Sequence, residues 1–474
     1  MTNQSTAARP TPEQRKASGK AARAKTPLEA HAEFRPAKSR DPVGLLLRQD
    51  ETRVPELVPI RHGRMLVSPF SFYRGAALVM AADLQTTPSP GLPAQLCGDA
   101  HLSNFGAYAS PERELVFDIN DFDETLRGPF EWDVKRLGAS FVVAGRDNGF
   151  TPKQCRKTTL AALKSYRTAM RAFAGQTILT VWYAHLNIEA AVADFTSGLT
   201  RRRLKKDKAE IKATDKLLAK ARTRDSLQAI GKLTTVSHGR TRIISDPPLV
   251  VRLDELVGMD TEAVLERIRD LLATYRDTLQ SDRRDLIDHF TLSDVAHKVV
   301  GVGSVGTRAW ILLLEGGVAE EALLLQAKQA EKSALADYAN DSEYANEGER
   351  VVAGQHLMQA TSDIFLGWLR AQPTGGESED YYVRQLRDWK VSAEIEKMTP
   401  RSMDVYARLC GWTLARAHAR SGDRLAISGY LGNSTRFDNA VADFAEAYAD
   451  QNERDHATFA DAVAAGRVEA QSGM

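Results

Sequence analysis

The amino-acid sequence predicts an α+β protein with two lobes, a helix-rich large lobe and a small antiparallel β lobe. Its 474 residues are 43% hydrophobic and 26% charged, so the chain can bury a core in each lobe. Apolar residues recur at helical spacing over residues 133–175 and 177–235 and again near the C-terminus. From residue 297 the pattern changes to short β-like runs joined by glycine or acidic turns, which places the β lobe between two helical regions.

Four segments follow from this pattern. Residues 1–41 are rich in small, basic and proline residues and offer few groups to bury, which predicts a disordered basic tail. Residues 42–290 are expected to form the first part of the large lobe. Residues 291–395 are expected to form the small β lobe, and residues 396–474 are expected to be helices that return to the large lobe.

The overall charge favours neither a nucleic-acid nor a membrane partner. Lysine and arginine (63) nearly balance aspartate and glutamate (62), for a formal net charge of +1. The charge-dense segment from Thr200 has no interleaved aromatic residues and is expected to be a solvated helix. No apolar run reaches the ~18–20 residues of a membrane helix. The separated cysteines Cys97, Cys155 and Cys410 lack zinc or disulfide spacing, so we expect a cytoplasmic protein.

The string GDAHLSN, residues 98–104, has the residue types of a phosphoryl-transfer loop. Asp99 precedes Asn104 by five residues, so one short loop can direct a carboxylate at an acceptor hydroxyl and an amide oxygen at a metal ion. The spacing resembles the catalytic loop of protein kinases and the HGDxHxxN loop of small-molecule kinases. The alternative is a structural loop in which Asp99 caps a turn and Asn104 has a left-handed conformation.

An acidic cluster follows the apolar run LVFDI about 17 residues after Asn104. Carboxylates at the end of a strand can hold a hard cation such as Mg²⁺. The string NDFDETLRGPFEWD is similar to the metal loop of small-molecule kinases, and this resemblance aligns Asp121 with the metal-binding aspartate and Asp133 with a structural one. Asp118 is a rival for the metal role, and an acidic solvated turn is the alternative.

The string GVGSVG contains Gly301, Gly303 and Gly306 and is a weak signal alone, because similar glycine patterns mark dinucleotide-binding folds. The following segment is β-rich instead of helical, and the next apolar run carries Lys328. This order resembles the second and third strands of a kinase, with Lys328 in the place of the phosphate-pairing lysine. A β-hairpin with flexible glycines is the alternative.

The motifs stand in an unusual order, because the glycine loop and lysine follow the other two loops by about 200 residues. Three strands are predicted in HKVVGVGSVG, TRAWILLLEG and EALLLQAKQA, followed by a helix around RVVAGQHLMQATSDIFLGWLR and a strand DYYVRQL. This order β, β, β, α, β resembles that of a kinase small lobe. In kinases a helix ending in a string like ALARLHA precedes the catalytic loop, and this chain has GWTLARAHA at residues 411–419. These resemblances imply a kinase-like fold that is circularly permuted, a change that surface chain ends tolerate.

Taken together, the longer motifs are similar to a bacterial family of unknown function, DUF2252, which is grouped with the protein kinase-like superfamily. The resemblance covers nearly all of residues 60–460. Cys97 departs from the small-molecule kinases, which have the histidine of HGD there, and no glutamate has decisive spacing to pair with Lys328. The matching strings are RMLVSPFSFYRG, CGDAHLSNFG, FDINDFDET, EWDVKRL, VGVGSVGTRAW, QAKQAEKSAL, GQHLMQATSDIFLGW and YVRQLRDWK; the glutamates considered are Glu331, Glu347 and Glu349.

These motifs and resemblances imply an ATP- and Mg²⁺-dependent phosphotransferase acting on a small-molecule or protein hydroxyl. Asp99 would orient or deprotonate the acceptor, and Asn104 and Asp121 would hold Mg²⁺. Lys328 and the amides around Gly301, Gly303 and Gly306 would hold the nucleotide phosphates. Two alternatives stay open. One is a catalytically silent nucleotide-binding regulator, and the other is a metallophosphoesterase, although no GNHD or GNHE string follows GDAH.

Overall fold

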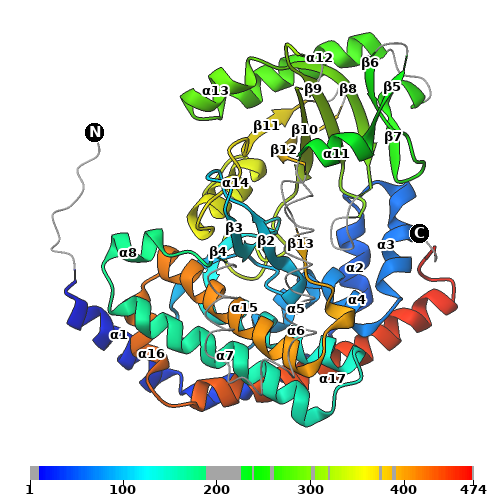
Figure 1. The fold of residues 1–474 in the computed structure, drawn as a ribbon. Helices are drawn as coiled ribbons and strands as arrows, with labels where there is room; N and C mark the ends of the chain where they lie inside the picture. The colour runs from blue at the N-terminus through cyan, green and yellow to red at the C-terminus, as the bar shows by residue number, and fades with distance from the viewer. Residues whose placement is uncertain are drawn as a thin grey trace, which may run out of the picture.

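Long helices form the base of the molecule, and a six-stranded antiparallel sheet stands above them (Figure 1). The computed structural model describes residues 10–187, 226–237, 240–256, 261–299, 305–318, 321–372, 376–386 and 391–471. The predicted helix from Thr200 lies outside these residues. None of the helices within them combines the length and apolar character needed to span a bilayer.

Four long helices build the base. Helix α15 (Pro400–Ser421) packs along α7 (Pro152–Ala174), and α17 (Arg436–Ala464) packs along α6 (Phe130–Asp147). Both α7 and α15 begin with a threonine N-cap followed by proline at the first helical position, a strong local start signal. Shorter helices complete the large lobe: α2 (Pro42–Asp50), α3 (Val58–Met65), α4 (Pro69–Gly75), α5 (Ala77–Leu84), α8 (Ile178–Tyr183) and α16 (Arg424–Leu431).

The N-terminal segment differs from the disordered tail that composition predicts over residues 1–41. Residues 12–25 form helix α1 (Pro12–Lys25), which packs closely against α16. Gly19 allows this approach, because a Cβ there would meet the Ala426 carbonyl oxygen at 1.9 Å. Arg15 also pairs with Asp423 at 2.8 Å, and Arg23 donates to carbonyl groups of α16. Composition misses these contacts because a glycine and two arginines, not large apolar residues, make them.

The loops that carry the candidate site lie on small sheets between the base and the large sheet. Strands β1 (Pro93–Leu96) and β4 (Leu126–Pro129) form one antiparallel pair. Strands β2 (Phe105–Ala109) and β3 (Leu115–Ile119) form another, and β13 (Val391–Ser392) adds to its edge. This arrangement places the β1–β2 loop and the β3–β4 loop next to each other, although they are separate in the sequence.

The large sheet has the order β11-β12-β10-β9-β8-β7, with all neighbours antiparallel. Strands β9 and β10 occupy the predicted β segments, whereas β8 lies a few residues earlier than expected. The six strands are β7 (Val250–Arg252), β8 (Thr291–Lys298), β9 (Ala309–Glu315), β10 (Ala322–Ala330), β11 (Gly367–Ala371) and β12 (Glu379–Gln385).

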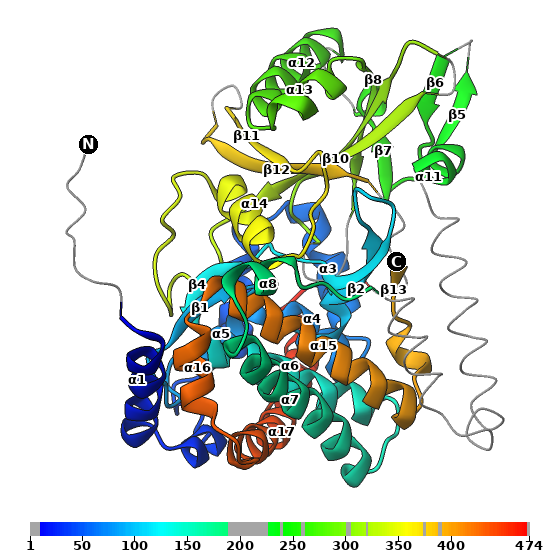
Figure 2. The same ribbon diagram turned by 60° about the vertical axis from the view of Figure 1, so that its left-hand side comes forward.

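The upper lobe also contains residues that the sequence assigns to the large lobe. Helices α12 (Thr261–Asp277) and α13 (Ser281–Ile287) lie over the sheet (Figure 2). Buried Tyr275 of α12 packs in the same apolar cluster as Leu325 and Val383, and its hydroxyl donates to the Phe365 carbonyl at 2.5 Å. Helix α11 (Ser226–Leu233) covers the other face beside the pair β5 (Thr234–Ser237) and β6 (Arg240–Ile243). Elements that precede the predicted boundary at residue 291 therefore pack against the sheet and belong to the upper lobe.

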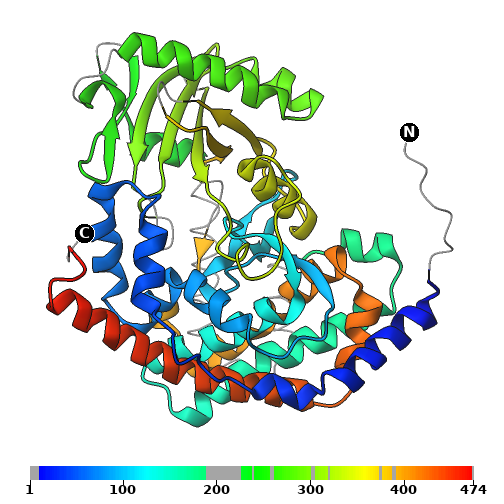
Figure 3. The same ribbon diagram turned by 180° about the vertical axis from the view of Figure 1, so that it is seen from behind.

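Helix α14 (Glu347–Met358) lies between the sheet and the large lobe and contacts β11, β12 and α15. The buried Arg350 guanidinium donates to the carbonyl groups of Thr125 at 2.7 Å and Glu331 at 2.8 Å. On the opposite side, α2 and α3 rise toward the sheet (Figure 3), and the Val54 N–H donates to the Gly306 carbonyl at 2.8 Å. The two lobes are thus joined on both sides of the space between them.

Candidate functional site

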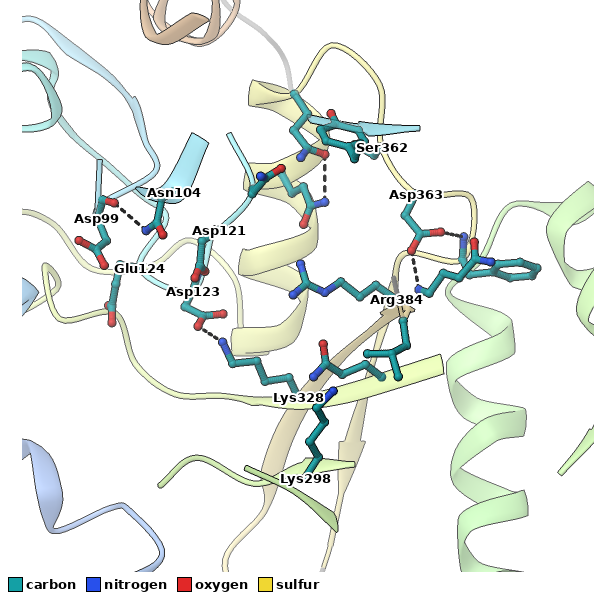
Figure 4. A pocket seen from close by; sticks show the side chains of 18 of the residues that line it. Asp99, Asn104, Asp121, Asp123, Glu124, Lys298, Lys328, Ser362, Asp363 and Arg384 are labelled. Carbon is teal, nitrogen blue, oxygen red and sulfur yellow. Dashed lines mark hydrogen bonds and ion pairs between the residues drawn. The ribbon is translucent and has the colours of Figure 1, made fainter. Parts of the chain in front are cut away.

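A cavity of 750 Å³ lies between the large sheet and the large lobe. Five of its lining residues are Asp99, Asn104, Asp121, Asp123 and Lys328, and Figure 4 shows them facing the same space. The first four come from the two neighbouring loops of the large lobe, and Lys328 comes from β10. The structure therefore brings together four of the sequence-predicted site residues, Asp99, Asn104, Asp121 and Lys328.

The loop between β1 and β2 is anchored from below by Asp133 of α6. The buried Asp133 carboxylate accepts the N–H groups of Cys97 at 2.9 Å and Gly98 at 3.1 Å, and His418 of α15 lies 3.3 Å from it. Gly98 has a φ of +83°, and a Cβ there would meet the Glu124 backbone, so this position requires glycine. Burial raises the pKa of the Cys97 thiol well above its usual value. Cys97 thus contributes its backbone amide to the loop, and not a reactive side chain.

Asp99 forms an ion pair with the buried guanidinium of Arg136. Burial raises the pKa of the Asp99 carboxyl, although Arg136 opposes this shift. The Asn104 amide donates to the Asp99 carbonyl at 2.9 Å, which orients its oxygen away from that bond. Arg113 is the only non-glycine described residue with positive φ, so Asn104 does not have the left-handed conformation of the structural alternative.

The acidic residues at the end of β3 and in the loop after it divide into a buried structural residue and a cavity-facing group. Asp118 pairs with buried Arg416 of α15 at 2.5 Å and accepts the Ala360 N–H at 2.9 Å. It is absent from the described lining of the cavity, whereas Asp121 and Asp123 belong to it. The Asp121 carboxylate accepts the Asp123 N–H at 3.2 Å, which fixes the turn between them. This geometry favours Asp121 over Asp118 for contact with a ligand.

Lys328 points from β10 across the cavity and forms an ion pair with Asp123. The Tyr382 hydroxyl of β12 donates to the other Asp123 oxygen at 2.8 Å. Although burial alone would raise the pKa of Asp123, Lys328 and Tyr382 hold it at about 2, and the carboxylate raises the pKa of Lys328. Both groups are therefore charged at neutral pH.

No glutamate has decisive spacing in the sequence to pair with Lys328, and the candidate at the start of α14 has another partner. Glu347 pairs with Arg350 at the start of α14. The α14 segment instead contributes the buried amides Gln355 and Gln359 to the cavity wall, and these are hydrogen-bonded to each other at 2.9 Å. The α14 segment therefore presents amide groups to the cavity.

The predicted glycine loop is only partly described. Gly301 and Gly303 lie outside the described residues. Gly306 has a φ of +94°, and a Cβ there would lie 2.9 Å from the Arg53 Cβ. The described lining of the cavity does not include Gly306, so this glycine has a structural contact with the large lobe at the position where the sequence predicts a phosphate contact.

Sequence reasoning missed several cavity residues, of which Arg384 of β12 is the most notable. Its register partner on β10 is Gln326, and both lie on the sheet face that carries Lys328. Within the described chain Arg384 has no hydrogen bond or salt bridge; its guanidinium lies 5.7 Å from the Tyr382 ring centroid. Strand alternation in YYVRQL could have placed Arg384 with Tyr382 on one face, but only the fold shows that this face meets the cavity.

The donor set fits a nucleotide with a magnesium ion. In the described parts of the chain, no three His, Cys, Asp or Glu side chains are grouped to hold a metal ion by themselves. Mg²⁺ usually needs only one or two carboxylates, with the remaining oxygens supplied by substrate phosphates and water. The Asp121 carboxylate and the Asn104 amide oxygen meet that requirement, and the cationic Lys328 and Arg384 face them (Figure 4).

Comparison with known proteins found one match. Neither the curated proteins nor the solved structures include one that matches this chain. A family model described as "Uncharacterized protein conserved in bacteria (DUF2252)" matches residues 53–462. This span contains both loops, the large sheet and α14 and ends near the C-terminal end of α17. The chain therefore belongs to the DUF2252 family.

Proposed function

We propose that the protein is an ATP- and Mg²⁺-dependent phosphotransferase with a circularly permuted kinase-like fold. One observation carries the proposal: Lys328 of the sheet meets the Asp121–Asp123 loop across a single cavity, although Lys328 and Asp123 are 205 residues apart in the sequence. Phosphoryl transfer requires a cation on the phosphates, oxygen ligands for Mg²⁺ and a carboxylate near the acceptor. The cavity contains all three kinds of group.

The sheet side of the cavity suits the nucleotide phosphates. Lys328 and Arg384 lie on neighbouring strands of one face, so both can contact phosphate oxygens. Asp121 and Asn104 would hold Mg²⁺, which when bound neutralises the negative charge on the phosphates. Binding the phosphates would separate Lys328 from Asp123, because a phosphate group replaces the carboxylate as its partner.

Asp99 suits the acceptor side. Its carboxylate lines the cavity and is held by Arg136, so a hydroxyl can be oriented by an oxygen whose position is fixed. The partner also keeps Asp99 available as an anion, since a nearby opposite charge favours the ionised form. Asp99 therefore accepts the hydroxyl proton as the new oxygen–phosphorus bond forms.

Two features support the permuted arrangement. Strands β8, β9 and β10 are followed by α14, β11 and β12, and Lys328 lies on the third of these strands, the location of the phosphate-contacting lysine in protein kinases. The C-terminal end of α15 lies beside the start of the site loop, since Ser421 Oγ accepts the Gln95 N–H at 3.2 Å. Joining these two points would restore the conventional order of kinase motifs.

A second candidate is a nucleotide-binding regulator without turnover. The observation that favours it is the pairing of both key charged groups within the protein, Lys328 with Asp123 and Asp99 with Arg136. In such a site a nucleotide phosphate can replace Asp123 as the partner of Lys328. Asp99 then stays paired with Arg136 and does not contact an acceptor hydroxyl. Nucleotide binding without transfer to any acceptor or to water would favour this candidate.

Calorimetric titration of ATP into the full chain, with and without Mg²⁺, tests the proposed function. We expect tight binding only with Mg²⁺, because the acidic loop repels phosphate until a cation neutralises it. Asp121→Asn should weaken the Mg²⁺-dependent binding by at least tenfold. The control Asp461→Asn removes the same charge from an exposed position on α17 and should change nothing. Equal, metal-independent binding by wild type and Asp121→Asn contradicts the proposal.

A further inference from the structure

The large-lobe side of the cavity contains an arginine that makes no salt bridge within the described chain, although Asp99, Glu396 and Asp121 act on it electrostatically. Arg74 at the end of α4 lines the cavity with Asp99 and His101. Its Nε atom is buried and has no hydrogen-bond partner, and no salt bridge joins it to another residue in the described chain. This N–H group has lost its water without gaining a protein acceptor, so the site is suited to an external anion.

The neighbouring basic side chains, Arg136 and His101, cannot serve an anion in the same way. The Arg136 guanidinium is already engaged in an ion pair with Asp99 and a hydrogen bond to the Tyr73 carbonyl. Burial lowers the pKa of His101 well below its usual value, so this imidazole is neutral. Arg74 acts on Asp99 electrostatically, but the direct ion pair of Asp99 is with Arg136, so the hydrogen-bonding capacity of Arg74 is left for a ligand.

A second donor faces the cavity close to the acidic loop. Asn120 precedes Asp121 and lines the cavity, and 8% of its surface is exposed. Its amide Nδ2 is buried and has no hydrogen-bond partner in the described structure. Buried amide donors are normally satisfied, so an unsatisfied one at a cavity wall indicates an acceptor atom supplied by a ligand.

We propose that the acceptor substrate is an anionic hydroxy compound, a hydroxylated carboxylate or phosphate ester, whose anionic group binds Arg74 and Asn120 while its hydroxyl meets Asp99. The inference rests on the proposed phosphotransferase function. The acceptor oxygen forms a bond to the γ-phosphorus of ATP, the bond from that phosphorus to the β,γ-bridging oxygen breaks, ADP leaves, and the hydroxyl proton passes to Asp99. Arg74 and Asn120 contact the substrate away from the reacting atoms and so select and orient it.

Inorganic phosphate is the probe for this anion site. The full chain is first saturated with Mg²⁺ and a non-hydrolysable ATP analogue, which occupies the nucleotide phosphate positions, and phosphate is then titrated calorimetrically. We expect saturable binding that Arg74→Gln weakens at least tenfold, with affinity for the analogue unchanged within about threefold. The control Arg171→Gln removes a charge from an exposed position on α7 and should leave phosphate binding intact.

Three outcomes overturn the inference: no phosphate binding by wild type, unchanged binding by Arg74→Gln, or a loss of analogue affinity in Arg74→Gln, which would place Arg74 on the nucleotide. If the chain binds no analogue, the proposed function fails separately. Phosphate titration of the nucleotide-free chain then shows whether the anion binds at Arg74 or on the sheet side of the cavity. Arg74→Gln should abolish phosphate binding there, whereas Arg384→Gln should retain it; the reverse result assigns the anion to the sheet side.

Discussion

The ammonium group of Lys328 on β10 forms an ion pair with the Asp123 carboxylate on the β3–β4 loop. Side-chain exposure is 6% for Lys328 and 26% for Asp123, so the pair is largely shielded from water. The pair joins the sheet to the large lobe inside the cavity where we propose that the nucleotide binds. A ligand that binds there must offer Lys328 a new anion and the acidic loop a new cation, which is what a magnesium–nucleotide complex provides.

Breaking this pair should destabilise the fold. Lys328→Met leaves Asp123 without its counter-charge, and we expect a loss of about 2–3 kcal/mol in the free energy of unfolding, somewhat below the values for fully buried pairs. Urea denaturation of Lys328→Met, Asp123→Asn and the double variant measures the coupling, which should be about 1–3 kcal/mol. Lys397→Met, which breaks an exposed pair with Glu394, should cost at most about 0.5 kcal/mol. Additive losses in the double variant would contradict the pairing.

Glu124 should make stability depend on pH. Burial raises its pKa from 4.5 to about 7, so the folded state holds a proton that the unfolded state has released. This contribution to stability is fully present below pH 4.5, decreases as pH rises, and is lost above about pH 7. Glu124→Gln still accepts the Ala334 N–H and should show a smaller decrease in unfolding free energy between pH 4.5 and 7. Parallel pH profiles for wild type and variant would show that Glu124 does not titrate there.

Local motifs were predictable from the sequence because their geometry depends on neighbouring residues. The spacing of Asp99 and Asn104 within one short loop, and the position of Asp121 at a strand end, required no knowledge of the fold. The strand pattern also placed Lys328 correctly on a β segment. The partner of Lys328 was not predictable, because Asp121 and Asp123 are only two positions apart in the sequence. Only the three-dimensional path of the loop presents Asp123 to β10.

Asp133 should control the shape of the site loop. Its two carboxylate oxygens accept the Cys97 and Gly98 amides, and an amide side chain can accept only one such bond well. Asp133→Asn should therefore lower the free energy of unfolding by about 1.5–3 kcal/mol, the usual range for charged hydrogen bonds. Amide hydrogen exchange should increase at Cys97 and Gly98 more than in α7. Unchanged exchange at these two amides would contradict the anchoring role.

The three cysteines should be unreactive in the native protein. Cys97, Cys155 and Cys410 are buried and free, and burial raises the pKa of each thiol above its usual value. Because the thiolate is the reactive form, a thiol reagent should modify all three only after denaturation. Rapid modification of Cys97 in the folded chain would show that the site loop opens to solvent.

Longer-range features explain the remaining differences between sequence and structure. Helix α1 is held by close backbone contact at Gly19 and by arginine pairs, signals that composition does not contain. Helices α12 and α13 have ordinary amphipathic patterns, which specify a buried face but not whether the base or the sheet covers it. Sequence alone could not assign Arg74 or Arg384 to the cavity, because an arginine is most often in an ion pair. Only the fold shows that neither has a salt bridge in the part of the chain that the structure describes.

The most direct test of the proposed function is transfer of the γ-phosphoryl group from ATP to water or to the protein, measured for wild type and Asp99→Asn with labelled ATP and Mg²⁺. We expect measurable turnover by wild type, a fall of roughly 10²-fold or more in the variant, and nucleotide affinity within a few-fold. Asp438→Asn is the control, because it breaks another buried arginine pair, with Arg167, and neither residue is in the cavity lining. Turnover should survive in this control. Full turnover by Asp99→Asn contradicts the account.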